Sequence, residues 1–438
     1  MTCVALSNRF GYDVAIMVGA EPPNIHEKSR QLQKNWHSMA NLHDQKNMSK
    51  RIFISAGEPS GDLHGSNLAK ALKAQWPDCE LIGFGGQKMA DAGVNLNCKL
   101  TDHAVMGFGK VVGKIGTFLG IVKQAARIFD EQRPDAVVLI DYPGLHWWIA
   151  KRAKQRGIPV FYHVPPQLWA WAGWRVEKMK RWVVEALTNF PFEDKWFRSK
   201  GMPSTLVGHP YFDELDHQKL DMEVVRKIQD SGTTIIGMLP GSRGGELSHN
   251  VPTMLQTAEI LVAKHPGVRF HFACYKAKQA DWVRAKIAEK PRWASLPIEI
   301  HSGNTPEVIE ASRFLIAVSG SVSLEFLWRT KPFVTIYQTT WFNMQMVKLL
   351  KKCQFISLIN LLSEKEVLPE FMDYKCQSQS LARVCLSWLG EPAKIDELRE
   401  KLIVLRAKWA IPGACERAAN HLVDRIQNQA SLFPIPLN

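Results

Sequence analysis

Short apolar runs alternate with amphipathic helical patterns along most of the chain after residue 50. Runs of strand length that are apolar at nearly every position are typical of a parallel sheet covered by helices on both faces. The first series of predicted strands comprises residues 51–57, 80–86, 136–141, 159–164 and 185–190, and the second comprises residues 233–239, 268–273, 298–302, 314–319 and 331–337. The pattern predicts two doubly wound α/β domains in tandem, with ligands bound at the carboxyl ends of their strands.

Changes in this pattern set the expected domain boundaries. Residues 1–47 show weak periodicity and are expected to be a poorly ordered extension. A first Rossmann-like domain follows over residues 48–212, and a charged, helix-prone link over residues 213–232. The second Rossmann-like domain covers residues 233–390, and the helical segment 391–438 is expected to pack back across both domains.

Composition narrows the class of protein. The chain of 438 residues is too long for a single ordinary hydrophobic core, and its apolar fraction of 46% is that of a globular protein. The formal charge of +13 favours an anionic partner: nucleic acid, an anionic membrane surface or a phosphorylated substrate. No arginine-rich tract or RNP-like aromatic strand occurs, and no apolar run of about 18 residues could span a bilayer.

Cysteines and histidines give no sign of a metal or disulfide framework. The eight cysteines lack CxxC or metal-ligand spacing, and the 14 histidines form no HExxH or similar set, so no metal site is expected. No secretory signal precedes the first pattern. We therefore expect reduced thiols in a cytosolic protein.

The first of three strand-to-helix junctions with candidate chemistry is ISAGEPSGDLHG, residues 54–65. Its small and polar residues are Gly57, Glu58, Ser60, Gly61, Asp62 and His64. The glycines allow close approach to the backbone, and the serine or aspartate can cap a helix that begins near Leu63. A capped turn explains most of these residues but not a glutamate beside a histidine, which favours a site for a polar ligand.

The second junction is MLPGSRGGEL, residues 238–247, in which a strand ends in a glycine-rich turn before a helix. Gly241 and Ser242 leave a helix N-terminus open, where backbone N–H groups and the helix dipole attract phosphate. Arg243 can bind phosphate oxygens in a bidentate manner. The turn is not a Walker A loop, and a simple glycine-rich turn with a solvated arginine is the alternative.

The third junction is VSGSVSLEFL, residues 318–327. Ser319, Gly320 and Ser321 let a ligand approach the backbone, and Glu325, one turn into the helix, is placed as a carboxylate that binds ribose hydroxyls. A serine cap followed by a glutamate at a helix start is the structural alternative.

These junctions, with further stretches, resemble the bacterial lipid-A-disaccharide synthases, a glycosyltransferase family with the two-domain GT-B fold. The matching stretches, over residues 51–365, are AGEPSGDLHG, GFGGQKM, VMGFGKVVG, DYPGLH, VPPQLWAWAGWRVEKMKR, FPFE, VGHP, LPGSRGGEL, SGSVSLEFL and ISLINLL. The resemblance implies an α/β protein of two doubly wound Rossmann-like domains that face each other across a cleft.

The resemblance also implies a reaction. UDP-2,3-diacylglucosamine would be the donor and 2,3-diacylglucosamine 1-phosphate the acceptor, whose 6-hydroxyl displaces UDP with inversion to give a β-1,6 disaccharide 1-phosphate. Members of this family are cytoplasmic and peripheral on the inner face of the inner membrane. They need no obligatory metal or other cofactor, and they are often homodimers that exchange C-terminal elements.

The resemblance assigns roles to residues of this chain. The candidate general bases are Glu58, Asp62 and Asp141, and Arg243 would act on the leaving diphosphate. The expected UDP-binding residues are Gly241, Ser242, Arg243, Ser319, Gly320, Ser321, Glu325 and Asn360. The expected acceptor and lipid contacts are Gly57, Ser60, Gly61, His64, Met106, Lys110 and Trp169.

Two departures from the family pattern affect these assignments. Gly144 stands where some members have a second aspartate after the equivalent of Asp141, so Glu58 becomes the first candidate for the base. His163 stands at a position that is usually tyrosine. The alternatives are another GT-B UDP-N-acetylglucosamine transferase or epimerase, and a catalytically degenerate scaffold that binds lipid or nucleic acid.

Two segments are candidates for contact with an anionic membrane surface. Residues 104–122 are apolar with interspersed lysines, and residues 341–352 form a basic amphipathic stretch. Ordinary helices that pack on their own domain would have the same pattern. The tryptophan-rich stretch 147–174 is expected either to line the acceptor side or to fill the core beneath it.

Overall fold

The computed structural model describes residues 50–101, 115–230, 232–351 and 353–428. The chain divides into two units, residues 1–50 and 51–438, and both sheets belong to the second. The expected extension 1–47 and the candidate lipid contacts Met106 and Lys110 lie outside the described residues.

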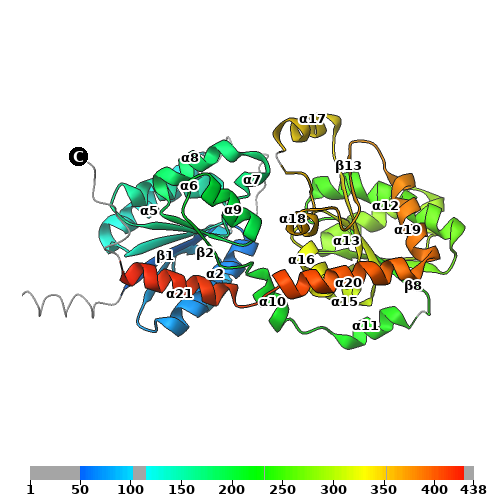
Figure 1. The fold of residues 1–438 in the computed structure, drawn as a ribbon, viewed down its shortest axis with the longest axis horizontal. Coiled ribbons are helices and arrows are strands. Elements are labelled where there is room, and N and C mark those ends of the chain that lie inside the picture. The colour runs from blue at the N-terminus through cyan, green and yellow to red at the C-terminus, as the bar shows by residue number, and fades with distance from the viewer. Residues whose placement is uncertain (1–49, 102–114, 231, 352, 429–438) are drawn as a thin grey trace, which may run out of the picture. The chain divides into compact units, whose positions relative to one another are not determined.

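The first sheet has seven parallel strands in the order β3-β2-β1-β4-β5-β6-β7 (Figure 1). The strands are β1 Arg51–Ala56, β2 Glu80–Gly85, β3 Asn95–Lys99, β4 Ala136–Ile140, β5 Val160–His163, β6 Glu185–Thr188 and β7 Ser204–Leu206. Every residue of β4 is buried, because one face of the sheet packs against α5 and α6 and the other packs against α2. This two-sided burial explains the continuous apolar runs in the sequence.

The helices of this half follow the strands that precede them. They are α2 Pro59–Gln75, α3 Gln87–Asp91, α5 Ile115–Gln132, α6 Pro143–Lys154, α7 Leu168–Trp171, the 3-10 turn η3 Gly173–Arg175, α8 Val176–Trp182 and α9 Pro191–Ser199. Helix α2 begins at Pro59, four residues before the predicted start near Leu63. Proline is favoured in the first turn because that position needs no N–H donor, and this explains the earlier start.

The second sheet has six parallel strands in the order β10-β9-β8-β11-β12-β13. The strands are β8 Thr234–Leu239, β9 Val268–Cys274, β10 Ile298–Ser302, β11 Phe314–Val318, β12 Phe333–Gln338 and β13 Glu370–Asp373. Its helices are α12 Gly244–Lys264, α13 Ala277–Ala288, α14 Pro291–Ala294, α15 Thr305–Ala311, α16 Ser323–Trp328, α17 Trp341–Leu350, α18 Leu358–Ser363 and α19 Ser378–Gly390. Both sheets are doubly wound, as the sequence predicts.

Two helical segments run between the two halves. The charged link contains α10 Tyr211–His217 and α11 Met222–Gln229, and the last two described helices are α20 Pro392–Trp409 and α21 Ala414–Gln427. Helix α20 packs against α16 and α19, and α21 packs against α2 of the first half (Figure 1). The Asp213 carboxylate of α10 accepts the backbone N–H groups of Gly413, Ala414 and Cys415, which caps α21.

All ten predicted strands are confirmed within two residues at each end. The strands β3, β7 and β13 were not predicted. Each is at or near a sheet edge, is only partly buried, and has a sequence without a continuous apolar run (NLNCK, STL and EFMD). None of the described helices is both long and apolar enough to cross a bilayer.

Candidate active site

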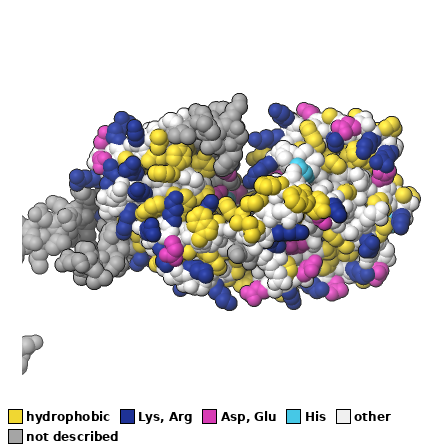
Figure 2. Space-filling model, turned by 90° about the horizontal axis from the view of Figure 1, so that it is seen from above, with side chains coloured by type: hydrophobic (Ala, Val, Ile, Leu, Met, Phe, Trp, Pro, Cys, Tyr) yellow, Lys and Arg dark blue, Asp and Glu magenta, His cyan; other side chains and the backbone are white. Residues whose placement is uncertain are grey.

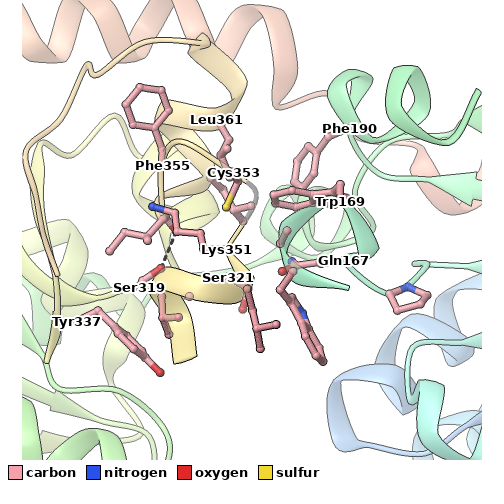
Figure 3. Close-up of a pocket in the computed structure, with 18 of the residues that line it drawn as sticks. Gln167, Trp169, Phe190, Ser319, Ser321, Tyr337, Lys351, Cys353, Phe355 and Leu361 are labelled. Atoms are coloured by element: carbon pink, nitrogen blue, oxygen red, sulfur yellow. Dashed lines mark hydrogen bonds between the residues drawn. The ribbon is translucent and has the colours of Figure 1, made fainter. Parts of the chain in front are cut away.

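A cavity of about 830 Å³ lies between the loops that follow the strands of the two sheets. The first half contributes Asp141 after β4, the segment 164–171 after β5, and Asn189 and Phe190 after β6. The second half contributes Arg243, Ser319–Ser321 and the region from Tyr337 to Leu361 (Figure 3). Strand carboxyl ends are the positions at which doubly wound sheets bind ligands.

The loop that carries Asp141 has an unusual backbone. Asp141 and Tyr142 both have positive φ angles, of 49° and 50°, which is rare for residues other than glycine. Such conformations cost about 1–3 kcal/mol each and persist where the surroundings hold them. Here the Tyr162 hydroxyl donates to the Asp141 carbonyl oxygen at 2.7 Å, and His146 Nδ1 lies 2.6 Å from the same oxygen.

His146 is a fixed support for this turn. Burial lowers the pKa of its imidazole to about 4, so the ring is neutral at pH 7. Because a carbonyl oxygen can only accept, Nδ1 carries the proton, and Nε2 accepts from the Ser55 hydroxyl at 2.9 Å. This chain of buried hydrogen bonds holds the Asp141 loop at the cavity wall.

Tyr142 also explains Gly57. A Cβ atom at residue 57 would overlap the Tyr142 ring. The glycine is therefore required by packing against the Asp141 loop, whereas the sequence suggested close approach of a ligand.

The structure brings Glu58, Asp141 and Arg243 into one electrostatic group, although they come from separate parts of the sequence. Burial raises the pKa of Glu58, the Asp141 carboxylate raises it further, and Arg243 lowers it. Burial also raises the pKa of Asp141, and the Tyr142 N–H, His64 and Arg243 oppose this. Asp141 lines the cavity directly, whereas Glu58 is the half-buried N-cap residue of α2.

Asp62 has a structural place instead of a place on the cavity wall. Its buried carboxylate accepts the backbone N–H groups of Gly86, Lys88 and Met89 at 2.7, 3.1 and 3.2 Å, which caps α3. It is not among the residues that line the cavity. The Asp62 side chain, which the sequence places just after a strand, therefore stabilises the start of a neighbouring helix.

Replacing Asp62 with alanine is expected to lower the free energy of unfolding by about 2–3 kcal/mol, because two buried N–H donors and one partly buried donor lose their acceptor. Urea unfolding measures this loss. The exposed neighbour Ser60→Ala is the matched control and should change stability by less than about 0.5 kcal/mol. If Asp62→Ala were fully stable yet lost activity, the aspartate would act on the substrate.

The turn before α12 is organised around Glu246. Its carboxylate accepts the N–H groups of Ser242 and Arg243 at 2.8 and 3.1 Å and pairs with the Arg243 guanidinium at 2.9 Å. Gly241 has φ of 98°, and a Cβ atom there would collide with Glu246. The N–H groups that the sequence offered to phosphate therefore already bind a carboxylate, while the Arg243 side chain is 79% exposed.

Two expected UDP contacts are engaged elsewhere. The buried Glu325 carboxylate accepts from the Tyr211 hydroxyl and from Arg329 Nε, each at 3.0 Å, which ties α16 to α10. The buried Asn360 accepts from the N–H groups of Val367 and Leu368 and donates to the Leu368 carbonyl and to Glu370. Neither residue lines the cavity.

Asn360 still acts on the cavity through its partner. Glu370 accepts the N–H groups of Ile356 and Ser357, and the Ile356 carbonyl accepts from the Ser319 hydroxyl at 2.8 Å. Asn360 therefore helps to position the loop that holds Ser319.

The expected acceptor contacts are divided between the surface, the core and the cavity. Ser60 is exposed and Gly61 is buried at the start of α2. His64 is buried, with Nδ1 3.3 Å from Oε1 of Glu214 on α10. Trp169 lines the cavity, and its Nε1 donates to Glu193 at 3.0 Å.

Sequence reasoning missed Glu193 as part of the site. Burial raises its pKa to about 7, and it accepts from Trp169 and from the Asn189 N–H at 3.1 Å. The residue belongs to the FPFE stretch that supported the resemblance, but no role was assigned to it. Its geometry shows that it fixes Trp169 in the cavity wall.

Sequence reasoning also missed the apolar wall of the cavity. This wall comprises Met346, Val347 and Leu350 of α17 with Phe355, Leu358 and Leu361. Trp169 and Phe190 lie across the cavity from Leu361 and Cys353 (Figure 3). The signal was present in the amphipathic stretch 341–352, for which membrane contact was the only function considered.

Comparisons with known proteins agree with this architecture. The lipid-A-disaccharide synthases of Syntrophus aciditrophicus and Legionella pneumophila (strain Philadelphia 1, synthase 1) are 33% and 32% identical to this chain. The two alignments cover 85% and 82% of this chain, and 96% and 93% of the respective relatives.

Among solved structures, a Staphylococcus aureus MnaA–UDP complex aligns with a TM-score of 0.57 at 12% identity, over 88% of this chain and 98% of that one. Acinetobacter baumannii MurG aligns with a TM-score of 0.51 at 16% identity, over 86% and 99%. Likeness at such low identity concerns the fold alone, and it confirms the expected GT-B architecture. The sequence model described as lipid-A-disaccharide synthetase matches residues 52–411, and the chain belongs to this family of glycosyltransferases.

Proposed function

We propose that this chain condenses UDP-2,3-diacylglucosamine with 2,3-diacylglucosamine 1-phosphate. The acceptor 6-hydroxyl attacks C1 of the donor sugar, the bond from C1 to UDP breaks, and the hydroxyl proton passes to a carboxylate. The observation that carries the proposal is one cavity in which Asp141, Arg243 and Ser319–Ser321 accompany an apolar wall. Such a cavity suits a substrate that joins a diphosphate to hydrocarbon chains.

Asp141 is the proposed general base. The residue lines the cavity, its backbone is held by Tyr162 and His146, and its raised pKa makes it a better proton acceptor than an exposed aspartate. Glu58, whose own pKa is raised by burial and by the Asp141 carboxylate, is the proposed second carboxylate of this group. The proposal therefore places Asp141 before Glu58 as the candidate base. The sequence, in which Gly144 stands where some members have a second aspartate, had placed Glu58 first.

Arg243 is the proposed partner of the leaving diphosphate. A guanidinium can pair with phosphate oxygens in a bidentate manner and stabilise the charge that develops as UDP departs. We further propose that diphosphate replaces the Glu246 carboxylate on Arg243 and on the N–H groups of Ser242 and Arg243. Ser319–Ser321 face this region from the end of β11.

The experiment that tests the proposal measures UDP release from the diacylated donor with and without the acceptor. Acceptor-dependent release, accompanied by the disaccharide product, is the expected result. Release without acceptor would indicate a hydrolase or epimerase-like enzyme. No release from folded protein and detergent-dispersed substrate would contradict the proposal and favour a degenerate scaffold.

The apolar wall is the proposed contact for an acyl chain. Leu361→Asn should lower kcat/KM for the long-chain donor about tenfold, because burying a leucine side chain contributes about 1.5–3 kcal/mol. A donor with short acyl chains should lose less. Ile403→Asn is the matched control, since Ile403 of α20 is 42% exposed and does not line the cavity. Equal losses on both donors would argue against chain contact at Leu361.

Helix α17 is also the proposed contact with an anionic membrane surface. Trp341, Phe342 and Leu349 are exposed on it, and Lys348 lies beside them. Figure 2, seen from the side that carries α17, shows hydrophobic side chains on this face with lysine and arginine among them. Of the other candidate segment, residues 104–114 lie outside the described residues.

The double variant Trp341→Ser/Phe342→Ser is expected to reduce co-sedimentation with vesicles of anionic phospholipid several-fold, because it removes two exposed aromatic side chains from the basic helix. Val404→Ser, which changes an equally exposed residue of α20, should have no effect. Unchanged co-sedimentation of the double variant would remove α17 from the proposed membrane contact.

A further inference from the structure

Two histidines and a glutamate meet on one face of the second sheet. In the parallel pairing of β9 with β10, His271 is the register partner of Glu299. Because side chains alternate along a strand, His301 lies on the same face of β10 as Glu299, two residues further on. Strand β10 is at the edge of the sheet, and none of the three residues lines the cavity.

The ligand atoms of the three side chains all lie within 4.8 Å of one another, close enough to reach one metal ion. His271 Nδ1 lies 2.8 Å from His301 Nε2, and the Glu299 oxygens lie 4.0 Å from the first nitrogen and 3.6 Å from the second. Zinc binds nitrogen and oxygen at about 2.0–2.1 Å, so tetrahedral ligands are about 3.3–3.4 Å apart. The distance from Glu299 to His271 is measured from Oε2 and the distance to His301 from Oε1, and the three separations lie on either side of the tetrahedral value.

The chemistry of the three groups also suits a divalent ion. Burial lowers the pKa of both imidazoles, that of His271 to about 4, which favours their neutral form. Neutral imidazole and carboxylate are common zinc ligands. The Glu299 side chain is 60% exposed, which leaves room for a water molecule as the fourth ligand.

We propose that His271, Glu299 and His301 form a site for one zinc ion, which joins the edge strand β10 to β9. Among the described residues, these are the three His, Cys, Asp or Glu side chains whose ligand atoms come within reach of one ion. In the absence of metal, the two rings share one hydrogen bond that the ion would replace. The site is independent of the proposed transferase reaction, because it rests on the sheet alone.

Zinc binding to the full-length, chelator-treated protein tests the proposal. Competition with a chromophoric chelator should show about one equivalent of zinc, and the double variant Glu299→Gln/His301→Gln should bind it at least about tenfold more weakly. Cobalt(II) should give the strong visible absorption of a tetrahedral site in the wild type only. His217→Gln, an exposed histidine on α10, is the matched control.

A second variant, which removes a nearby positive charge, is expected to strengthen zinc binding instead of weakening it. Arg269 lies two residues before His271 on the same face of β9, and its positive charge repels a divalent cation. Arg269→Gln should therefore tighten zinc binding a few-fold. The proposal is overturned if the double variant retains the wild-type affinity for zinc. It is also overturned if the wild type and the double variant bind the same amount of zinc. Either result leaves the UDP-release assay unaffected, so the two proposals fail separately.

Discussion

The variant Asp141→Asn is expected to lower the turnover number for acceptor-dependent UDP release by about 10³-fold. A positioned general base contributes about 10²–10⁴-fold, and the amide is isosteric but cannot accept the proton. Steady-state assays at saturating donor and acceptor measure this effect. The Michaelis constant for the donor should change little, because Arg243 and the apolar wall remain in place.

The pH profile tests the same role independently. The base must be ionised, and burial raises its pKa, so kcat/KM should begin to fall at a higher pH than an exposed carboxyl would give. Arg243→Ala removes a positive charge that favours ionised Asp141, and the acid limb should move to higher pH.

Glu58→Gln is the control for the assignment of the base. If Asp141 is the base, the Glu58 variant retains most of its turnover at neutral pH. If instead Glu58→Gln abolishes turnover and Asp141→Asn does not, the roles are reversed. Circular dichroism and urea unfolding should accompany both variants, since Asp141 belongs to a strained turn.

Arg243→Ala is expected to lower turnover by about 10²–10³-fold, the usual effect of removing one donor that meets developing charge. UDP should also become a weaker product inhibitor, because the guanidinium is the proposed partner of the diphosphate. The side chain is 79% exposed, so the variant should fold normally. Product inhibition and turnover are measured in the same UDP-release assay.

The matched control for this prediction is Arg284→Ala, which removes an exposed arginine of α13 that pairs with Asp281. It should leave turnover and UDP inhibition unchanged. Arg243→Lys should recover only part of the activity, since an ammonium cannot form the bidentate pair. Full activity of Arg243→Ala would show that the diphosphate is held without this residue.

The central strands of both sheets could be predicted because burial on two faces leaves a continuous apolar run. Strand β4, with the sequence AVVLI, is buried along its whole length. The strands β7 and β13 are partly exposed and short, so their sequences carry no such signal. For these strands pairing with a neighbour decides the structure, and pairing is a property of the fold.

The candidate site was predicted as a set of strand-to-helix junctions, and the sequence could not tell which polar residues would face a ligand. Asp62 and Glu325 both follow strand ends, as Asp141 does, yet one caps α3 and the other pairs with Arg329 and Tyr211. A carboxylate is available to a ligand only where the chain offers it no better partner.

The sequence by itself determined the two doubly wound sheets, the family and the three junctions, since these depend on local apolar patterns and contiguous motifs. Only the tertiary structure decided that Asp141 lines the cavity while Asp62 supports a helix. It also brought His271 beside Glu299 and His301, which lie 28 and 30 residues further along the chain. Contacts of this kind follow from the register between strands, and no spacing within the sequence records that register.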